Sequence, residues 1–429
     1  MKKMQLLLAA GTALTASAGF SGAAHAQAFY LQEQSARGAG RAFSGEVADT
    51  GAASLWWNPA AIADADRIEA NLNVAAILPR GQVVDTGTLI RRPGGQPFAP
   101  VGGDSTTRNP INNGVLPSGA IAVPLGHRVA IGLAVTSPYS FTTEYPASSW
   151  ARYSAATTRL RTVDIQPSIA VSVTDWLRVG AGANVEYTDA RLGNALPNVL
   201  ASLPDGRQEL KGDGWDVGWS AGFQIHNERV TAGFSYKSSI RHKLNGSLTV
   251  SGLVGPLAPN NMSLSNVEAD FYTPAQAIGG VRWKATDRLT LNGQVVRYGW
   301  DKFDAIRLGA PLNTALPENY RASWSYAGGV DYMVSPALTV RAGVQRATTP
   351  TRDGGRDARV PDANRWNFGA GGSYAVTKNI VLDAAANYVD FANASIDRPT
   401  IAAGSTIVTQ GQLRNARAFV FSLGGRVQF

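Results

Sequence analysis

Residues 418–429, the last of the chain, alternate strictly between two kinds of position. One set of alternate residues, from Phe419 to Phe429, is apolar apart from a single glycine. The other set, from Ala418 to Gln428, mixes small, polar and charged side chains. A period of two indicates a β-strand with one apolar face and one mixed face.

The same alternation recurs throughout the chain after residue 65. In residues 68–78, for example, apolar side chains alternate with Glu69, Asn71 and Asn73. No apolar run after residue 26 approaches the ~20 residues that a membrane-spanning helix needs. The pattern predicts fourteen strands, near residues 68–79, 117–125, 128–139, 160–174, 176–191, 214–227, 229–249, 272–285, 288–302, 322–335, 337–349, 365–377, 379–394 and 415–429.

The connections between these strands alternate in length. Tight turns, such as Gly126-His127 and Thr174-Asp175, alternate with seven longer loops rich in glycine, proline and polar residues. Short turns at one end, long loops at the other and an even strand count are typical of a bacterial outer-membrane barrel. A soluble β-sandwich also alternates, but one of this length normally divides into domains, and no linker-like stretch interrupts residues 66–429.

We therefore predict an all-β membrane protein, a 14-stranded antiparallel outer-membrane β-barrel over residues 66–429. In a closed barrel every backbone N–H and C=O group is hydrogen-bonded without water, so the apolar face can contact lipid.

The N-terminus has the features of an export signal. Lys2 and Lys3 precede an apolar stretch from about Leu6, and Ala24-His25-Ala26 is a small-residue cleavage site. We predict a signal peptide over residues 1–26, with residues 26–28 as the next candidate site. An uncleaved membrane anchor is the alternative, which the glycine, serine and threonine content disfavours. Export and barrel together predict the outer membrane of a Gram-negative bacterium.

Composition narrows the possible chemistry. Charged residues make up 16% of the chain, below the ~25% typical of soluble proteins. The absence of cysteine excludes disulfides, thiolate metal sites and cysteine nucleophiles. The net charge is +8 without any basic run, so we predict no nucleic-acid partner.

Residues 27–65 do not alternate and are interrupted by glycines. Short helical turns are expected around residues 44–49 and 58–63. A disordered periplasmic tail is the alternative, but Leu55, Trp56 and Trp57 would be poorly soluble in one. We predict that this segment folds back into the barrel as a plug, or hatch, of short helices.

The hatch segment also resembles a known family. The stretch FYLQEQSARGAGRAFSGEVADTGAASLWWNPAAIA is similar to the N-terminal hatch of the FadL/TodX-type long-chain fatty-acid and hydrophobic-compound transporters. Its strongest match is Asn58-Pro59-Ala60, which resembles the N-P-A motif of the family. The later stretches FSYKSSIRHKLNG, PENYRASWSYAGGVDY and VPDANRWNFGAGGSY are also similar, so the resemblance covers the mature chain.

The resemblance implies a monomeric barrel that takes up hydrophobic molecules passively. They would be captured at the outer loops, bind in the lumen and leave laterally into the membrane through an inward kink of the third strand. Gly132 and Pro138 are permissive sites for such a bend. Phe429 resembles the C-terminal aromatic signal that the barrel assembly machinery recognises. Outer-membrane lipid and lipopolysaccharide would surround the wall.

Candidate site residues follow from the same resemblance. Asn58, Pro59 and Ala60 would couple the hatch to the wall near the third strand, although Asn58 could merely cap a helix that Pro59 begins. Phe29 would contact ligand deep in the barrel, unless the mature terminus is disordered. Arg321 and, more loosely, Arg191 match basic residues that bind a fatty-acid carboxylate.

Two loops carry apolar clusters that could form the first hydrophobic capture groove, or could simply pack on themselves. Their members are Leu196, Val199, Leu200 and Leu203 in one loop, and Leu253, Val254 and Leu257 in the next.

No catalytic, metal or cofactor site is predicted. The pairs Gly38-x-Gly40 and Gly180-x-Gly182 lack the rest of a dinucleotide motif, and His127, His226 and His242 are far apart in sequence. The predicted function is transport of hydrophobic compounds. A general diffusion porin for small polar solutes, and a structural or adhesive barrel without transport, remain alternatives.

Overall fold

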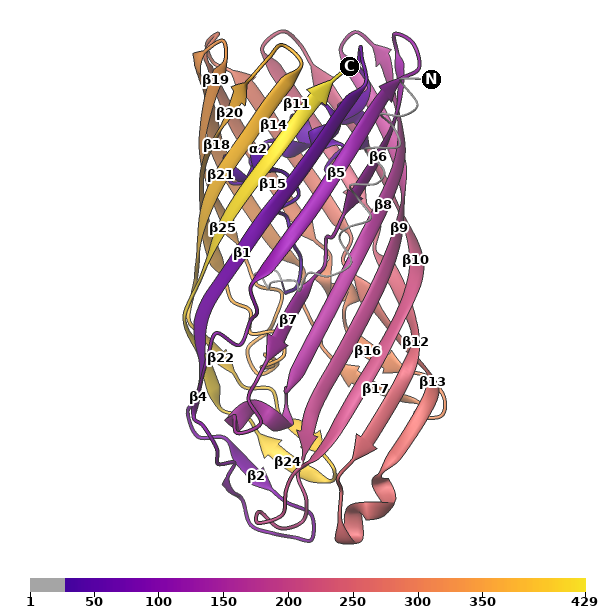
Figure 1. Ribbon diagram of the computed structural model, residues 1–429, viewed down its shortest axis with the longest axis vertical. Coiled ribbons are helices and arrows are strands. Elements are labelled where there is room, and N and C mark those ends of the chain that lie inside the picture. The colour runs from indigo at the N-terminus through magenta and orange to yellow at the C-terminus, as the bar shows by residue number, and fades with distance from the viewer. Residues whose placement is uncertain (1–27) are drawn as a thin grey trace.

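The computed structural model describes residues 28–429, and the predicted signal peptide lies outside them. The chain forms a closed antiparallel barrel of 14 strands with its short turns at one end and its long loops at the other (Figure 1). The first and last strands pair to close it. Both the start of the first strand and the C-terminus lie at the short-turn end. No helix in the described part of the chain is long and apolar enough to cross a membrane.

The barrel strands, some of them interrupted, are β1 (Glu69–Asp85), β5 (Gly114–Pro124), β6 and β7 (Val129–Thr136, Phe141–Glu144), β8 (Thr157–Thr174), β9 (Leu177–Leu196), β10 (Gly206–His226), β11 and β12 (Val230–Lys237, Ile240–Ser251), β13 and β14 (Met262–Thr273, Gln276–Lys284), β15 and β16 (Leu289–Tyr298, Ala305–Leu308), β17 and β18 (Thr314–Pro317, Ser323–Ser335), β19 (Leu338–Ala347), β20 (Arg365–Ala375), β21 (Ile380–Phe391) and β25 (Gly411–Gln428). Short extracellular strands are β2 (Leu89–Arg91), β3 (Ala99–Pro100), β4 (Thr106–Arg108), β22 (Ala394–Ile396), β23 (Thr400–Ala402) and β24 (Ser405–Val408).

The apolar alternation faces outward, as predicted. Leu72, Phe421 and Leu423 are 53%, 52% and 62% exposed on the barrel exterior, whereas Ala75 and Val420, on the alternate sets of the same two strands, are fully buried. The C-terminal Phe429 is also exposed, and its N–H donates a hydrogen bond to the carbonyl of Ile68 at 2.9 Å. The exposed apolar surface is the one that lipid covers in an outer-membrane barrel.

The predicted strand limits are wrong mainly at the extracellular ends. The structure extends β9 to Leu196 and begins β10 at Gly206, leaving a much shorter loop than the predicted 192–213. It also starts β13 at Met262, inside a predicted loop, and interrupts the predicted strand 229–249 after Lys237. Outside the hydrocarbon region both faces of a strand can be polar. The hydrogen-bonded strand therefore continues beyond the point where apolar and polar residues cease to alternate in the sequence.

Residues 28–65, called the hatch below, lie inside the barrel and are almost entirely buried (Figure 1). They form four short helices, α2 (Ala36–Ala39), η2 (Glu46–Ala48), η3 (Ala52–Ser54) and η4 (Pro59–Ile62). Three more helical turns lie in the extracellular half: η5 (Trp150–Tyr153), η6 (Gly255–Asn260) and η7 (Trp300–Lys302).

Candidate functional site

The Asn58-Pro59-Ala60 motif begins a helix and also joins the hatch to the wall. The Asn58 side chain accepts from the N–H of Ala60 at 3.0 Å, and Pro59 occupies the first turn, where its missing N–H costs nothing. The amide nitrogen of Asn58 donates to the carbonyls of Val47 at 2.8 Å and of Phe223, on β10, at 3.1 Å. The wall partner is thus β10, and the expected bond near the third strand is not what the structure shows.

A buried ion cluster, the hatch ion cluster, fixes the other side of the hatch. Arg41, fully buried, contacts Glu46, Asp49 at 2.5 Å, and Asp331 of β18 at 3.2 Å. Asp331 also holds two wall arginines, Arg282 at 3.0 Å and Arg341 at 2.7 Å, and Arg37 completes the cluster at 3.3 Å from Asp49. The two arginines and two carboxylates of the hatch balance one another, and Asp331 with its two wall arginines joins this set to the wall.

Glycines on the inner face of the wall let the hatch backbone approach closely. At Gly343 a β-carbon would lie 2.1 Å from the carbonyl oxygen of Arg41, and at Gly180 it would lie 2.5 Å from the backbone of Pro59 and Ala60. Neither position could carry a side chain without moving the hatch. Gly233, Gly329 and Gly369 meet the hatch backbone in the same way, and Gly222 meets the side chain of Asn58.

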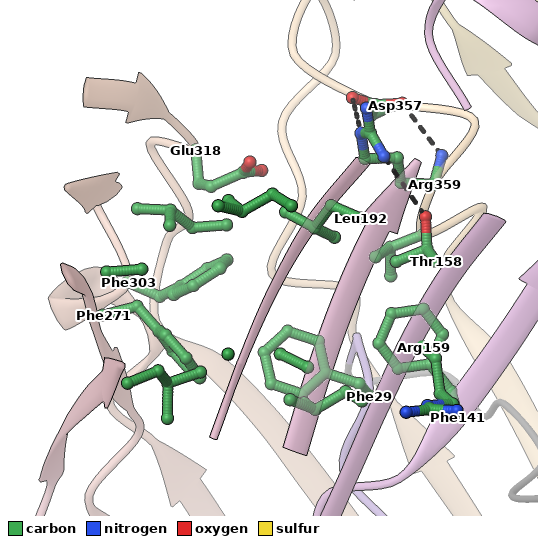
Figure 2. Close-up of a pocket in the computed structure, with 18 of the residues that line it drawn as sticks. Phe29, Phe141, Thr158, Arg159, Leu192, Phe271, Phe303, Glu318, Asp357 and Arg359 are labelled. Carbon is green, nitrogen blue, oxygen red and sulfur yellow. Dashed lines mark hydrogen bonds and ion pairs between the residues drawn. The ribbon is translucent and has the colours of Figure 1, made fainter. Parts of the chain in front are cut away.

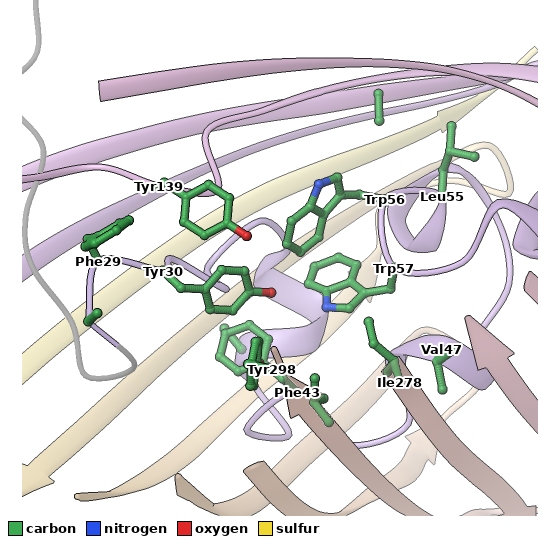
Figure 3. Packing of buried hydrophobic residues seen from close by; sticks show 14 of the residues in the cluster. Phe29, Tyr30, Phe43, Val47, Leu55, Trp56, Trp57, Tyr139, Ile278 and Tyr298 are labelled. Carbon is green, nitrogen blue, oxygen red and sulfur yellow. The ribbon is translucent and has the colours of Figure 1, made fainter. Parts of the chain in front are cut away.

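An aromatic cluster surrounds the start of the hatch (Figure 3). The ring of Phe29 packs edge-on against Trp300, with centroids 4.9 Å apart, and stacks on Phe141 at 5.7 Å. Tyr30 packs against Tyr298 at 5.0 Å. The beginning of the hatch is thus an ordered part of the lumen wall and not a free tail.

Phe29 lines an apolar pocket of about 780 Å³, part of it open to solvent (Figure 2). Strands β8, β9, β10, β12 and β13 contribute side chains, and the extracellular segments around residues 303–320 and 357–360 close over it. The apolar residues that line it are Phe29, Phe141, Leu160, Ala190, Leu192, Leu210, Leu244, Ala269, Phe271, Phe303, Ile306, Tyr320 and Val360.

The polar end of the pocket carries charges that are already paired. Arg398 lies 3.0 Å from Glu318 and 3.3 Å from Asp357. Arg359 lies 4.0 Å from Asp357, and its guanidinium donates to Asn194 at 3.2 Å and to Thr158 at 3.5 Å. Burial raises the pKa of Glu318 to about 7, against the opposing effect of Arg398. Two carboxylates and two arginines therefore balance one another here.

A second polar cluster lies on the inner face of the wall, against Trp56 of the hatch. The Lys237 ammonium stands 3.9 Å from the ring centroid of Trp56 and donates to Gln166 at 3.2 Å. Asp164 accepts from Asn184 at 2.8 Å nearby. Lys237 was not among the residues predicted for the site. Its one available signal was its place on the inward-facing set of a strand, which many polar residues share.

The third barrel strand is interrupted where the hatch touches it. β6 ends at Thr136 and β7 begins at Phe141, and the N–H of Leu31 donates to the carbonyl of Pro138 at 2.7 Å. The ladder between β5 and β6 runs only from Gly119 to Pro124 on the β5 side. On the inner face of β5, the hydroxyl of Ser118 donates to the carbonyl of Gln34 in the hatch at 3.0 Å.

The two arginines expected to bind a carboxylate do not line this pocket. Arg191 lies on the outward-facing set of β9, with Asp189, and its guanidinium donates to Glu209. Arg321 is exposed between β17 and β18, and its N–H donates to the carbonyl of Pro350 at 2.9 Å. The structure brings Arg359, not these two, to the pocket.

The two apolar loops do lie together. Asn198 donates to the carbonyl of Gly252 at 3.1 Å and accepts from the N–H of Val254 at 3.0 Å. Leu196 and Leu253 are buried in one shared cluster, with Leu257 packed against it, whereas Leu200 and Val254 are 54% and 38% exposed. Val199 and Leu203 are half-buried.

Comparison with known proteins agrees with this architecture. A family model described as outer membrane protein transport protein (OMPP1/FadL/TodX) matches residues 17–429. The 47 kDa outer membrane protein of Pasteurella multocida is 29% identical over 408 residues, 89% of this chain and 90% of that one. The long-chain fatty acid transport protein of Escherichia coli O6:H1 is 24% identical, covering 84% and 86% of the two chains.

Solved structures show the same fold. A FadL homologue of Pseudomonas aeruginosa superposes with a TM-score of 0.82 at 24% identity, over 94% of this chain and all of that one. The toluene transporter TodX of P. putida gives 0.66 at 15% identity, over 95% and 99%. The barrel, its internal hatch and the match along nearly the whole sequence place this chain in the OMPP1/FadL/TodX family of outer-membrane transport proteins.

Proposed function

We propose that this protein carries hydrophobic compounds passively across the outer membrane, with the apolar pocket as the binding site in the lumen. That pocket is the observation that carries the proposal. Burial of apolar surface is worth ~25 cal/mol per Å², so a hydrophobic solute gains there what it would lose in a water-filled channel. Relatives named as fatty-acid and toluene transporters support the same class of cargo.

Entry and exit can be assigned to named segments. The exposed Leu200 and Val254, on adjoining loops, offer first contact to a solute. The interrupted third strand supports release sideways into the membrane, because the hatch contacts the wall at the interruption, where the N–H of Leu31 donates to the carbonyl of Pro138. Movement of Leu31–Gln34 would then uncover the wall. Asn58, Pro59 and Ala60, seated on β10, would limit how far that movement spreads.

Binding of apolar probes distinguishes this function from the porin alternative. The purified protein should bind oleate and an alkylbenzene, measured by displacement of a fluorescent hydrophobic probe. Liposomes containing it should not swell in sugar solutions faster than empty liposomes, because the hatch fills the lumen. Rapid swelling without probe binding would instead identify a general porin.

The paired charges at the pocket's polar end predict a pH effect that depends on ligand charge. Below pH 7 Glu318 takes up a proton, since its pKa is about 7, and one negative charge facing the ligand is lost. Binding of a fatty-acid carboxylate should therefore strengthen about fivefold between pH 8 and pH 6, as expected for relief of ~1 kcal/mol of repulsion. An uncharged alkylbenzene should bind with the same affinity at pH 8 and at pH 6.

The matched variant is Glu318→Gln, which keeps the shape of the side chain and removes the titration. It should bind the carboxylate at pH 8 as the original protein does at pH 6. A pH dependence that persists in this variant would rule out Glu318 as its source.

A further inference from the structure

Four arginines gather on the outer face of the wall where the first and last strands meet. Arg80 on β1 lies directly across the ladder from Arg417 on β25. Beyond the bulge that follows Arg80, Gln82 lies between Arg414 of β25 and Arg108 of β4. All four arginines are exposed. The seam that bears them runs across the front of Figure 1.

The alternation places all four side chains outside the lumen. On β25, Phe419 and Phe421 are exposed on the same set as Arg417, whereas Ala418 and Val420 are fully buried. Beyond the bulge Val83, Leu413 and Thr107 are buried, so their neighbours Gln82, Arg414 and Arg108 point outward. We call these four residues, Arg80, Arg108, Arg414 and Arg417, the seam arginines.

Within residues 28–429 no ion pair neutralises any seam arginine. Arg80 donates to Asn113 at 2.8 Å and to the carbonyl of Pro79 at 2.6 Å, and Arg414 donates to Gln412 at 2.8 Å. These partners are all uncharged. One carboxylate, Asp390, lies across the ladder from Arg417. Arg80 and Arg417 are directly opposite and repel each other, so an anion bound from outside the protein would stabilise the group.

The other charged wall shows the contrast. On β9 and β10, Arg191, Arg207 and Lys211 all converge on Glu209. Arg159 is paired with Asp189 at 2.6 Å. On that wall the basic side chains are ion-paired with carboxylates, whereas at the seam the one carboxylate across the ladder, Asp390, forms no ion pair within 4 Å among the described residues.

The height of the seam arginines on the barrel indicates which anion they meet. Immediately toward the short-turn end lie the lipid-facing rings of Phe419 and Tyr388, with centroids 5.4 Å apart. Aromatic rings mark the edge of the hydrocarbon layer. The arginines are therefore at the level of the headgroups in the outer leaflet, where lipopolysaccharide carries its lipid A phosphates. The guanidinium fork matches phosphate oxygens, and basic groups at this level attract anionic lipids.

We propose that the seam arginines form a binding site for the phosphates of lipid A. One lipid molecule held there would lie across the β1–β25 closure and add its own contacts to the join between the two ends of the barrel. This site is separate from the lumen pocket, so it neither needs nor alters the transport proposed above.

The test is titration of the delipidated, detergent-solubilised protein with diphosphoryl lipid A, followed by native mass spectrometry. The double variant Arg80→Gln with Arg417→Gln should bind at least about tenfold more weakly, since hydrogen bonds to charged groups are among the strongest available. The control is Arg229→Gln with Arg288→Gln, which removes two exposed arginines from the short-turn end. It should stay within about twofold of the original.

Two further measurements use only the original protein, so they test the site even if the double variant does not fold. Monophosphoryl lipid A should bind the original protein more weakly than the diphosphoryl form, and inorganic phosphate at millimolar concentration should not displace the lipid. Equal binding of both lipids, equal binding by the double variant, or displacement by inorganic phosphate would each overturn the proposed site.

Discussion

Ala190→Trp should abolish most ligand binding and uptake while leaving the barrel intact. Ala190 is on β9, on the set of residues that points inward, and it lines the apolar pocket. An indole there would occupy space that a ligand otherwise fills. A ligand deprived of about 80 Å² of apolar contact loses about 2 kcal/mol, or a factor of about 30 in affinity. Because the pocket is partly empty and open, the strain of overpacking should be small.

The matched control is Ala183→Trp, seven residues earlier on the same strand. Ala183 is exposed on the outward-facing set, so the same indole would lie against lipid. Probe displacement should be unchanged in this variant, and both proteins should keep the heat-dependent gel shift of a folded barrel. Normal binding by folded Ala190→Trp would mean that ligands occupy some other part of the lumen.

The barrel was predictable because lipid imposes one rule on every strand. A residue such as Phe421 or Leu423 must be apolar wherever its strand crosses hydrocarbon, so the period of two survives without knowledge of the neighbours. That rule ends at the headgroups. Arg207 and Lys211 belong to β10, but neither face of the strand is apolar there, and the prediction began the strand at residue 214.

The same alternation could have corrected the prediction that Arg191 binds ligand. Arg191 shares its set with Val185 and Tyr187, which the alternation assigns to the lipid side. A similarity of motif position suggested a ligand contact, and the alternation on the same strand was the better guide. Arg321 gave no such signal, because it lies between strands, where alternation says nothing.

The residues that shape the pocket's polar end could not be found from sequence. Arg359 lies 201 positions from Thr158, and only the inward folding of an extracellular segment brings them together. Lys237 is one of many polar residues on the inner face of the wall, and it is distinguished only by the position of Trp56 in the hatch. Residues that face the lumen show no regular sequence pattern of their own, because they contact side chains from any part of the chain.

The hatch ion cluster shows how strongly such long-range contacts can bind. The carboxylate of Asp49 is buried, which alone would raise its pKa, but Arg282, Arg37 and Arg41 together hold that pKa well below its ordinary value. A carboxyl group with a lowered pKa in the folded state stabilises that state at all pH values above its ordinary pKa, and loses this effect only as the pH falls through the lowered value. The hatch should therefore stay seated at mildly acidic pH.

Arg41→Met should release the hatch. The substitution keeps most of the side-chain volume but leaves Glu46, Asp49 and Asp331 without their shared cation, and Arg41 itself is fully buried. Removing one partner of a buried ion pair costs about 3–5 kcal/mol. Amide hydrogen exchange over residues 36–63 should accelerate by about two to four orders of magnitude, and planar bilayers containing the variant should conduct ions.

The control for this experiment is Arg128→Met. Arg128 pairs with Asp175 at 3.1 Å, but both side chains are mostly exposed, and such pairs contribute little. The rate of amide hydrogen exchange in the hatch of this variant should match that of the original protein. Adding Glu46→Gln to Arg41→Met should recover part of the protection, because among the described residues Arg41 is the one cation paired with Glu46, and the second change removes the charge left without a partner. If exchange in Arg41→Met stayed at the original rate, the glycine-lined contacts between hatch and wall, and not the ion cluster, would be what holds the hatch in place.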